Sequence, residues 1–514
     1  MPFIFSFRKA YGRIARVLGY AFFIFPLAGS GQFTFDANCL NAYRSVLSLK
    51  FAEAKEFLGE ERRADPSNLV PVYLEDYMDF LTVFIGQEKE AFERYRGSHE
   101  KRVDAVKAGS ADSPYYGFCL GTMRLQFAVA RMQFGESRSA VFDLSKAYRD
   151  FQSAEYAYPR FLPVKTGLGF VHILAGLAGD SYGWLLRLAG FSGTVEEGMQ
   201  EITGVADYRG PDELEGIPGT EALFFLSMAS AFLGSDKTLS AEVIKRFENR
   251  PGPFPPAGNP LVIFAESTVY LKNGMNDAAL ATLKGYVYRP GEFPFYYLDF
   301  LTGKALLNKL DPGADRYFIR FLKNFRGINY IRSAYQKLAW TCLLAGDTVK
   351  YREYTKKILT RGGSLFDTDV QALREAESDF IPNVVLLKAR LLSDGGYYDR
   401  ALDLLLGNRL SSFVASQKDL VEYHYRLGRI YQGLGSDDHA LRCFGETIRL
   451  GKGLPWYFAA NAALQSGLIE EQRGAFREAE QYYSMVLSMN YSEYKTGLDQ
   501  KARAGLKRVK KHLG

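Results

Sequence analysis

Residues 425–444 read YRLGRIYQGLGSDDHALRCF, and the spacing within this stretch decides the fold. Gly435 stands five residues before Ala440, and Phe444 follows four residues later. The same glycine-to-alanine step recurs 39 residues upstream and 39 residues downstream, at Gly396 with Ala401 and at Gly474 with Ala479. A fixed period of this length predicts a stack of similar supersecondary units along the chain.

Each copy is expected to be a pair of antiparallel helices. Leu427 and Gly428 would lie on a first helix, Tyr431 one turn further on, and Gly435 at the hairpin turn. Ala440 and Phe444 would lie on the second helix. The small Gly428 and Ala440 allow the two helices to approach closely, while the large apolar residues share one helix face and fill the space between hairpins.

This pattern resembles the tetratricopeptide repeat (TPR), in which Leu-Gly, Tyr, Gly, Ala, Phe, Ala and Pro stand at set offsets across 34 residues. The residues of 425–444 named above match it, whereas Thr447 and Lys452 replace the final Ala and Pro. The resemblance implies an all-α fold, a TPR-like α-α superhelix that is a solenoid of helical hairpins. It also implies a concave groove lined by the first helices.

A wider resemblance covers residues 40–510. A further repeat copy at residues 128–147 and the glycine-rich segment after it are similar to bacterial cell-envelope TPR proteins of unassigned role. Gly190-Phe191-Ser192-Gly193, followed by Gly198, distantly resembles an element of the inclusion-body-clearance family.

Composition shifts predict five segments. We expect a signal peptide or N-terminal anchor over 1–31 and an N-terminal helical domain with degenerate hairpins over 32–248. A proline-rich linker over 249–260 would separate it from a TPR array over 261–500, and a basic capping helix would occupy 501–514. Five prolines in the linker exclude a continuous helix there.

The first segment has the order of charges of an export signal. Basic residues between Arg8 and Arg16 precede an apolar run from Val17 to Ala28, and small residues follow. This run of about 12 residues is shorter than the roughly 20 needed to span a bilayer. We therefore expect export to the periplasm or cell envelope, with an uncleaved membrane anchor or an organelle-targeting leader as alternatives.

The composition argues against nucleic-acid binding and gives no cofactor signature. The chain has 64 basic and 58 acidic residues, a mild net charge of +6 over 514 residues. Four cysteines lie far apart without metal-ligand spacing, and their disulfide state stays open: Cys39, Cys119, Cys342 and Cys443. His172, in the glycine-rich segment, is read as a hydrogen-bonded core residue rather than as an acid–base group or ligand.

No catalytic motif stands out, so the sequence predicts neither an enzyme nor a metal site. The leading hypothesis is a non-enzymatic scaffold of the cell envelope that binds a protein partner in the concave groove. A helical-repeat protein that binds carbohydrate or a small ligand is the alternative. By the register of the TPR family, the residues expected to face inward are Asn383, Arg390, Tyr425, Arg429 and Gln432.

Overall fold

The computed structural model describes residues 31–177, 190–208, 217–233, 237–249, 258–378 and 380–513. The expected export signal, apart from Gly31, and residues 250–257 of the expected linker lie outside these ranges. Within them the chain forms helices and turns, together with one isolated bridge between Gln32 and Asn68.

Successive helices pack as antiparallel hairpins. In the N-terminal half these are α1 (Ala37–Leu47) with α2 (Phe51–Ala64), α3 (Val70–Gly86) with α4 (Lys89–Lys107), α5 (Pro114–Gln133) with α6 (Ser137–Ala157), α7 (Val164–Leu177) with α9 (Val195–Ala206), and α10 (Ile217–Leu233) with α11 (Lys237–Glu248).

The C-terminal half continues the series. Its hairpins are α12 (Pro260–Lys272) with α13 (Asn276–Lys284), α14 (Tyr297–Asn308) with α15 (Ala314–Asn324), α16 (Ile331–Leu344) with α17 (Thr348–Thr360), α19 (Val384–Asp394) with α20 (Tyr398–Gly407), α22 (Gln417–Gly433) with α23 (Asp437–Gly451), and α24 (Phe458–Gln472) with α25 (Phe476–Ser488). Three helices stand outside the pairs: α18 (Asp367–Glu377), the one-turn α21 (Leu410–Phe413) and the terminal α26 (Lys495–Leu513).

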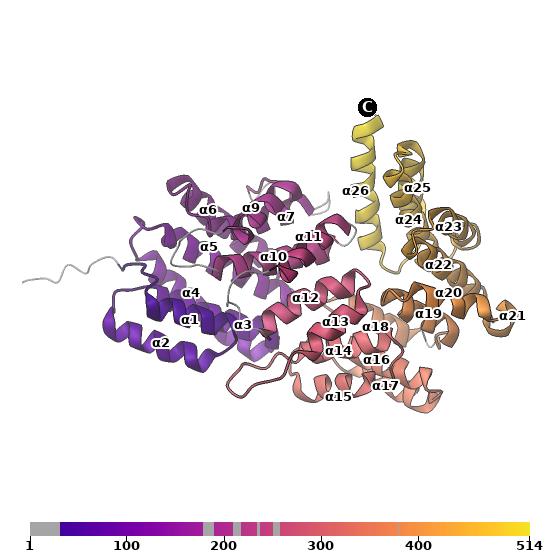
Figure 1. Cartoon of the computed structure of the whole chain (residues 1–514), viewed down its shortest axis with the longest axis horizontal. Helices are drawn as coiled ribbons and strands as arrows, with labels where there is room; N and C mark the ends of the chain where they lie inside the picture. The colour runs from indigo at the N-terminus through magenta and orange to yellow at the C-terminus, as the bar shows by residue number, and fades with distance from the viewer. Residues whose placement is uncertain are drawn as a thin grey trace, which may run out of the picture.

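The hairpins follow one another in a curved array. Second helices pack on the next first helix, as α13 does on α14, α15 on α16 and α23 on α24, except that α17 packs on the inserted α18. Figure 1 shows the array running from the N-terminal half along α14 to α17, then turning upward through α22 to α26. The predicted fold class, an all-α TPR-like solenoid of helical hairpins, is confirmed for the described residues.

The three copies of the glycine-to-alanine step occupy equivalent places. Gly396, Gly435 and Gly474 end the first helix of successive hairpins in left-handed backbone, with φ of +80°, +72° and +76°. This conformation is accessible to glycine at little cost, which explains the residue at the turn. Ala401, Ala440 and Ala479 each have 0% exposure on the second helix.

The close helix crossings leave no room for a side chain at Gly428 and Gly467 in the last two hairpins. A Cβ atom added to Gly428 would lie 2.5 Å from Cδ1 of Phe444, and one added to Gly467 would lie 2.7 Å from Cε1 of Tyr483. Leu427 is buried and Tyr431 is half-buried against the preceding hairpin. The helices therefore touch through glycine on one side and an aromatic ring on the other.

One continuous core runs through most of the array. Its buried residues extend from Phe33 to Leu391, on both sides of residues 249–260. Two smaller clusters lie within and between the last three hairpins. The expected division into two domains at 249–260 stays a prediction.

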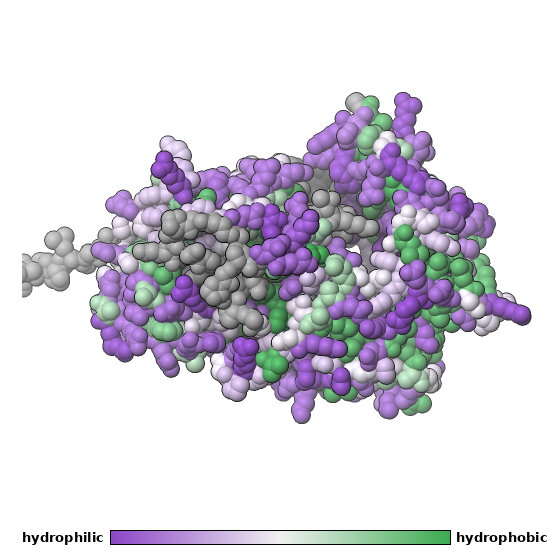
Figure 2. Space-filling model, in the orientation of Figure 1, coloured by the Kyte–Doolittle hydropathy of each residue, from purple (hydrophilic) through white to green (hydrophobic). Residues whose placement is uncertain are grey.

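The C-terminal helix closes the array and is longer than expected. α26 begins at Lys495, six residues before the predicted start, and buries Leu498, Ala502 and Val509 beside α24 and α25. Its outward residues are basic, and Figure 2 shows mostly hydrophilic side chains on the face that contains this helix. No helix among the described residues combines the length and apolar character needed to cross a bilayer.

Candidate functional site

A cavity of about 240 Å³ opens between α16, α18, α19 and α22 and the loops that precede α24 and α26. It exists because α18 is inserted between two hairpins and widens the step from one first helix to the next. Its aromatic lining residues are Trp340, Phe380, Trp456, Tyr457, Phe458 and Tyr494. Its charged lining residues are the basic Lys337, Arg374, Arg390, Lys418 and Arg426 and the acidic Glu375, Glu422 and Glu493.

The acidic side chains are already engaged in the cavity walls. The two carboxylate oxygens of Glu375 accept hydrogen bonds from Nε2 of Gln336 and Nε1 of Trp340, each at 2.7 Å. Glu422 Oε1 accepts from both Nε and Nη2 of Arg426, at 3.0 and 2.7 Å. Glu375 thus fixes α18 against α16, and Glu422 neutralises the buried Arg426.

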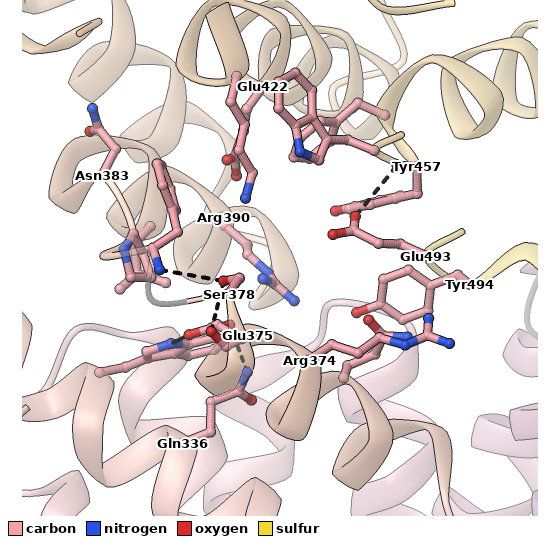
Figure 3. A pocket seen from close by; sticks show the side chains of 18 of the residues that line it. Gln336, Arg374, Glu375, Ser378, Asn383, Arg390, Glu422, Tyr457, Glu493 and Tyr494 are labelled. Atoms are coloured by element: carbon pink, nitrogen blue, oxygen red, sulfur yellow. Dashed lines mark hydrogen bonds between the residues drawn. The ribbon is translucent and has the colours of Figure 1, made fainter. Parts of the chain in front are cut away.

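Three of the cations lie against aromatic rings instead of carboxylates. Nζ of Lys337 is 3.6 Å from the centre of the Trp340 ring, and the guanidinium carbon of Arg390 is 5.0 Å from it. Nζ of Lys418 is 4.2 Å from the centre of the Phe380 ring. Figure 3 shows Arg390 projecting into the middle of the cavity, with Glu375 on one side and Tyr494 on the other.

The charge of Lys337 is disfavoured by its surroundings. Burial, followed by repulsion from Arg390, lowers the pKa of the Lys337 ammonium to about 7. Its only hydrogen-bond partner among the described residues is Oε1 of Gln336, at 2.8 Å. The carboxylate nearest to the Arg390 guanidinium is that of Asp394. Its Oδ2 lies 3.8 Å from Nε of Arg390, which is too long for a strong ion pair.

Basic residues recur at the same register of successive first helices. Lys304, Arg390 and Arg429 stand six residues before the hairpin turns at Leu310, Gly396 and Gly435. Lys337 and Arg426 stand nine residues before their turns, which places them on the same helix face one turn earlier. Lys272 of α12 and Lys501 of α26 do not share this register, but each repels a member of it, Lys304 and Arg429 respectively. We call the whole set the basic row: Lys272, Lys304, Lys337, Arg390, Arg426, Arg429 and Lys501.

The five residues expected to face inward fall in different places. Asn383 and Arg390 both line the cavity. Asn383 also caps α19, because its Oδ1 accepts from the backbone N–H of Val385 and Leu386. Arg429 and Gln432 are half-buried on α22 and do not line the cavity.

Tyr425 does not face the cavity. Its side chain is 3% exposed, and its hydroxyl oxygen accepts a hydrogen bond of 2.7 Å from Nδ2 of Asn461. The reason is that α22 packs between α23 and α24 at this point, so the ring fills the space between hairpins. The binding role assigned to these five residues stays a prediction.

Sequence reasoning missed several lining residues, above all Lys337, Trp340, Lys418 and Trp456. Lys337 and Trp340 could have been predicted, since they stand three residues apart on α16 and therefore share the helix face that the repeat pattern turns inward. Lys418 and Trp456 could not have been predicted. They line the cavity only because α18 is inserted between two hairpins and the array bends there.

A second polar cluster surrounds His172 on α7. Its Nδ1 lies 2.7 Å from Oε2 of Glu201, and its Nε2 lies 3.3 Å from the Tyr148 hydroxyl, which contacts Oγ of Ser192 at 2.9 Å. With Glu197, the His172 and Glu201 side chains bring three ligand atoms within 4.8 Å of one another. Both ring nitrogens are already hydrogen-bonded, which makes His172 a connector of α6, α7 and α9.

Comparison with known proteins adds little to this geometry. No protein-family model matches the chain, and no curated protein matches it in sequence. A chain from the crystal structure of the APC/C hetero-tetramer Cut9-Hcn1 is similar, with 12% sequence identity, a TM-score of 0.24 and coverage of 91% of this chain and 95% of that chain. At this TM-score the similarity says nothing about function, and the fold assignment rests on the helices described above.

Proposed function

We propose that the protein is a non-enzymatic scaffold that binds a segment of a protein partner on its concave inner surface. The observation that carries this proposal is the aromatic and cationic cavity between the first helices, where Arg390 and Lys418 present charge without a close carboxylate partner. Arg and aromatic side chains contribute strongly to protein interfaces, because they combine apolar area with directional donors.

The size of the cavity favours a partner segment over a small molecule. Sites for drug-sized ligands measure about 300–1,000 Å³, whereas this cavity measures about 240 Å³. A space of this size accommodates one or two side chains of a segment that continues across the neighbouring helices. The basic row on those helices offers such a continuation.

Site-specific photo-crosslinking in cells tests the proposal. A photoreactive phenylalanine analogue at Asn383, which lines the cavity, should give one discrete crosslinked partner. The same analogue at Lys356, an exposed residue of α17, is the matched control and should not give it. Absence of an adduct at Asn383, or the same adduct at both positions, would contradict the proposal.

The place of action that we propose is the cell envelope, reached through the N-terminal leader. The order of residues 8–28, a basic stretch followed by an apolar run, is typical of an export signal and supports this location. N-terminal sequencing of the mature protein tests it, and a chain that retains its first residues and fractionates away from envelope and membranes would contradict it.

The alternative function is binding of a carbohydrate or small ligand. The aromatic surfaces of Trp340 and Trp456 in one cavity favour it, because sugar rings stack on exposed aromatic faces. A thermal-shift screen with sugars separates the two functions, since a ligand at 100 times its dissociation constant stabilises by about 2.7 kcal/mol.

A further inference from the structure

Four members of the basic row have no side-chain partner among the residues that the structure describes. Lys272, Lys304, Arg429 and Lys501 make no ion pair and no hydrogen bond through their side chains with any described residue. They lie on four different helices, α12, α14, α22 and α26. Other cations of the chain are paired, as Arg320 is with Asp299 and Arg508 with Glu471. What distinguishes Lys272, Lys304, Arg429 and Lys501 is that these unpaired cations gather from four helices.

These cations also lie close to one another. The pKa of Lys304 is lowered by burial and then by repulsion from Lys272, with a further contribution from Arg390. The pKa of Lys501 is lowered by burial and then by repulsion from Lys272 and Arg429. The lower end of α26 lies near α12 in the view of Figure 1, in agreement with the repulsion between Lys501 of α26 and Lys272 of α12.

Apart from Glu422, which pairs with Arg426, the carboxylates of the same surface leave the basic row without close counter-charges. Glu375 is held by Gln336 and Trp340, and Glu422 by Arg426. Asp394 contributes attraction to Lys304 and Lys337 without forming a close pair with either. Like charges gathered without counter-charges repel one another and cost stability, and a bound anion would relieve that cost.

We infer that the hollow of the array binds an acidic segment of the protein partner, whose carboxylates face the basic row while an apolar or aromatic side chain enters the cavity beside Trp340. This inference rests on the proposed scaffold function and adds the chemistry of the partner. The cations that meet the acidic residues are Lys272, Lys304, Arg390, Arg429 and Lys501.

An acidic protein segment fits this surface better than a nucleic acid. A nucleic-acid duplex carries one charge per roughly 1.7 Å of its axis and would meet Asp394, Glu422 and Glu493 on the same face. A peptide spaces its charges and has backbone N–H groups that can donate to these carboxylates. A free small anion would leave most of the row unused.

Selection of peptides from a phage-displayed dodecapeptide library on the purified full-length protein tests the inference. The wild type should enrich sequences that combine several acidic residues with an aromatic or aliphatic one. A variant with the row neutralised (K272Q, K304Q, R429Q and K501Q) should bind the best selected peptide at least about tenfold more weakly, because up to four ion pairs are lost. Affinity of the wild type should also fall as salt rises.

The matched control neutralises exposed basic residues of the second helices and the loop after α23, with K284Q, K356Q, K452Q and R352Q. It should bind the peptide as the wild type does. The melting temperature of the row variant should equal or exceed that of the wild type without peptide, which separates lost binding from lost folding.

Each other outcome overturns the inference. Selection of neutral or basic peptides would show that the groove binds a partner of different chemistry and would leave the scaffold function standing. Unchanged binding by the row variant would place the acidic segment elsewhere. Displacement of the peptide by an equimolar 20-nucleotide single-stranded DNA would make a nucleic acid the occupant. If no peptide is selected, the inference fails, and the crosslink at Asn383 decides the scaffold function independently.

Discussion

The ammonium of Lys337 lies 3.6 Å from the centre of the Trp340 ring, three residues further along the same helix. A cation over an aromatic face is attracted by the ring, but that attraction does not replace water or a carboxylate. The lysine therefore sits in a cavity where its charged form is disfavoured, and this has a measurable consequence for stability.

The substitution Lys337→Met should change how stability depends on pH. In the folded state the pKa of Lys337 is lowered to about 7 from 10.5, by burial first and then by the charge of Arg390, with Glu375, Lys304 and Asp394 also facing it. Between these two values the unfolded chain binds more protons than the folded one, so this lysine makes the free energy of unfolding rise with pH. The variant should lack this contribution.

Urea unfolding at pH 6, 7, 8 and 9 measures the effect. The stability of K337M relative to the wild type should be greatest at pH 6 and should decline as pH rises, by at most about 1.4 kcal/mol per pH unit. The control is K356M, on the outer helix α17. Parallel curves for K337M and the wild type would mean that Lys337 keeps an ordinary pKa.

Gly428 and Gly445 provide a matched test of the helix crossings. A methyl group on Gly428 would meet the ring of Phe444, which has 0% exposure and cannot move aside. Gly428→Ala should therefore destabilise the protein by about 1–3 kcal/mol. A methyl group on Gly445, in the exposed part of α23, would meet nothing within 4 Å, so Gly445→Ala should stabilise by up to about 1 kcal/mol.

Chemical denaturation of the two alanine variants beside the wild type gives the comparison. Opposite signs support a TPR-like crossing at Gly428. Equal stabilisation by both substitutions would contradict the packing of α22 against α23.

Much of this architecture could be predicted from the sequence, because it depends on local spacing. Gly435, Ala440 and Phe444 fix a turn and a crossing within 20 residues, and that unit repeats. The cavity could not be predicted in the same way, since its lining residues are far apart in the sequence. Trp340 lies on α16, Lys418 on α22 and Trp456 in the loop before α24. Tyr425 shows why the register of a family pattern is not sufficient to place a side chain. The pattern predicts that this position faces inward, but in this chain the ring fills the space between α22 and α24.

Glu221 on α10 should make the N-terminal half sensitive to pH. Burial raises the pKa of its carboxyl from 4.5 to about 7, while the Tyr77 hydroxyl donates a hydrogen bond of 2.6 Å to it. The folded state thus binds more protons than the unfolded chain between these values. Its contribution to stability is complete below pH 4.5 and is lost as pH rises through about 7.

The substitution Glu221→Gln should remove the decrease in stability that the wild type shows as pH rises through about 7. Its thermal unfolding should vary less between pH 5 and 8 than that of the wild type, and it should be the more stable of the two at pH 8. The exposed Glu100 supplies the control, E100Q. A wild-type-like pH profile for E221Q would show that the carboxyl ionises normally in the folded protein.

The most direct test of an acidic partner segment on the inner surface is the fluorescence of Trp340 during a peptide titration. In a variant with W184F and W456F, which keeps Trp340 as the only tryptophan, the selected acidic peptide should shift the emission in a saturable way. The shift should weaken with added salt and disappear when R390Q and K418Q are also present. Saturable binding of the peptide by another method, without any change in Trp340 emission, would contradict the account.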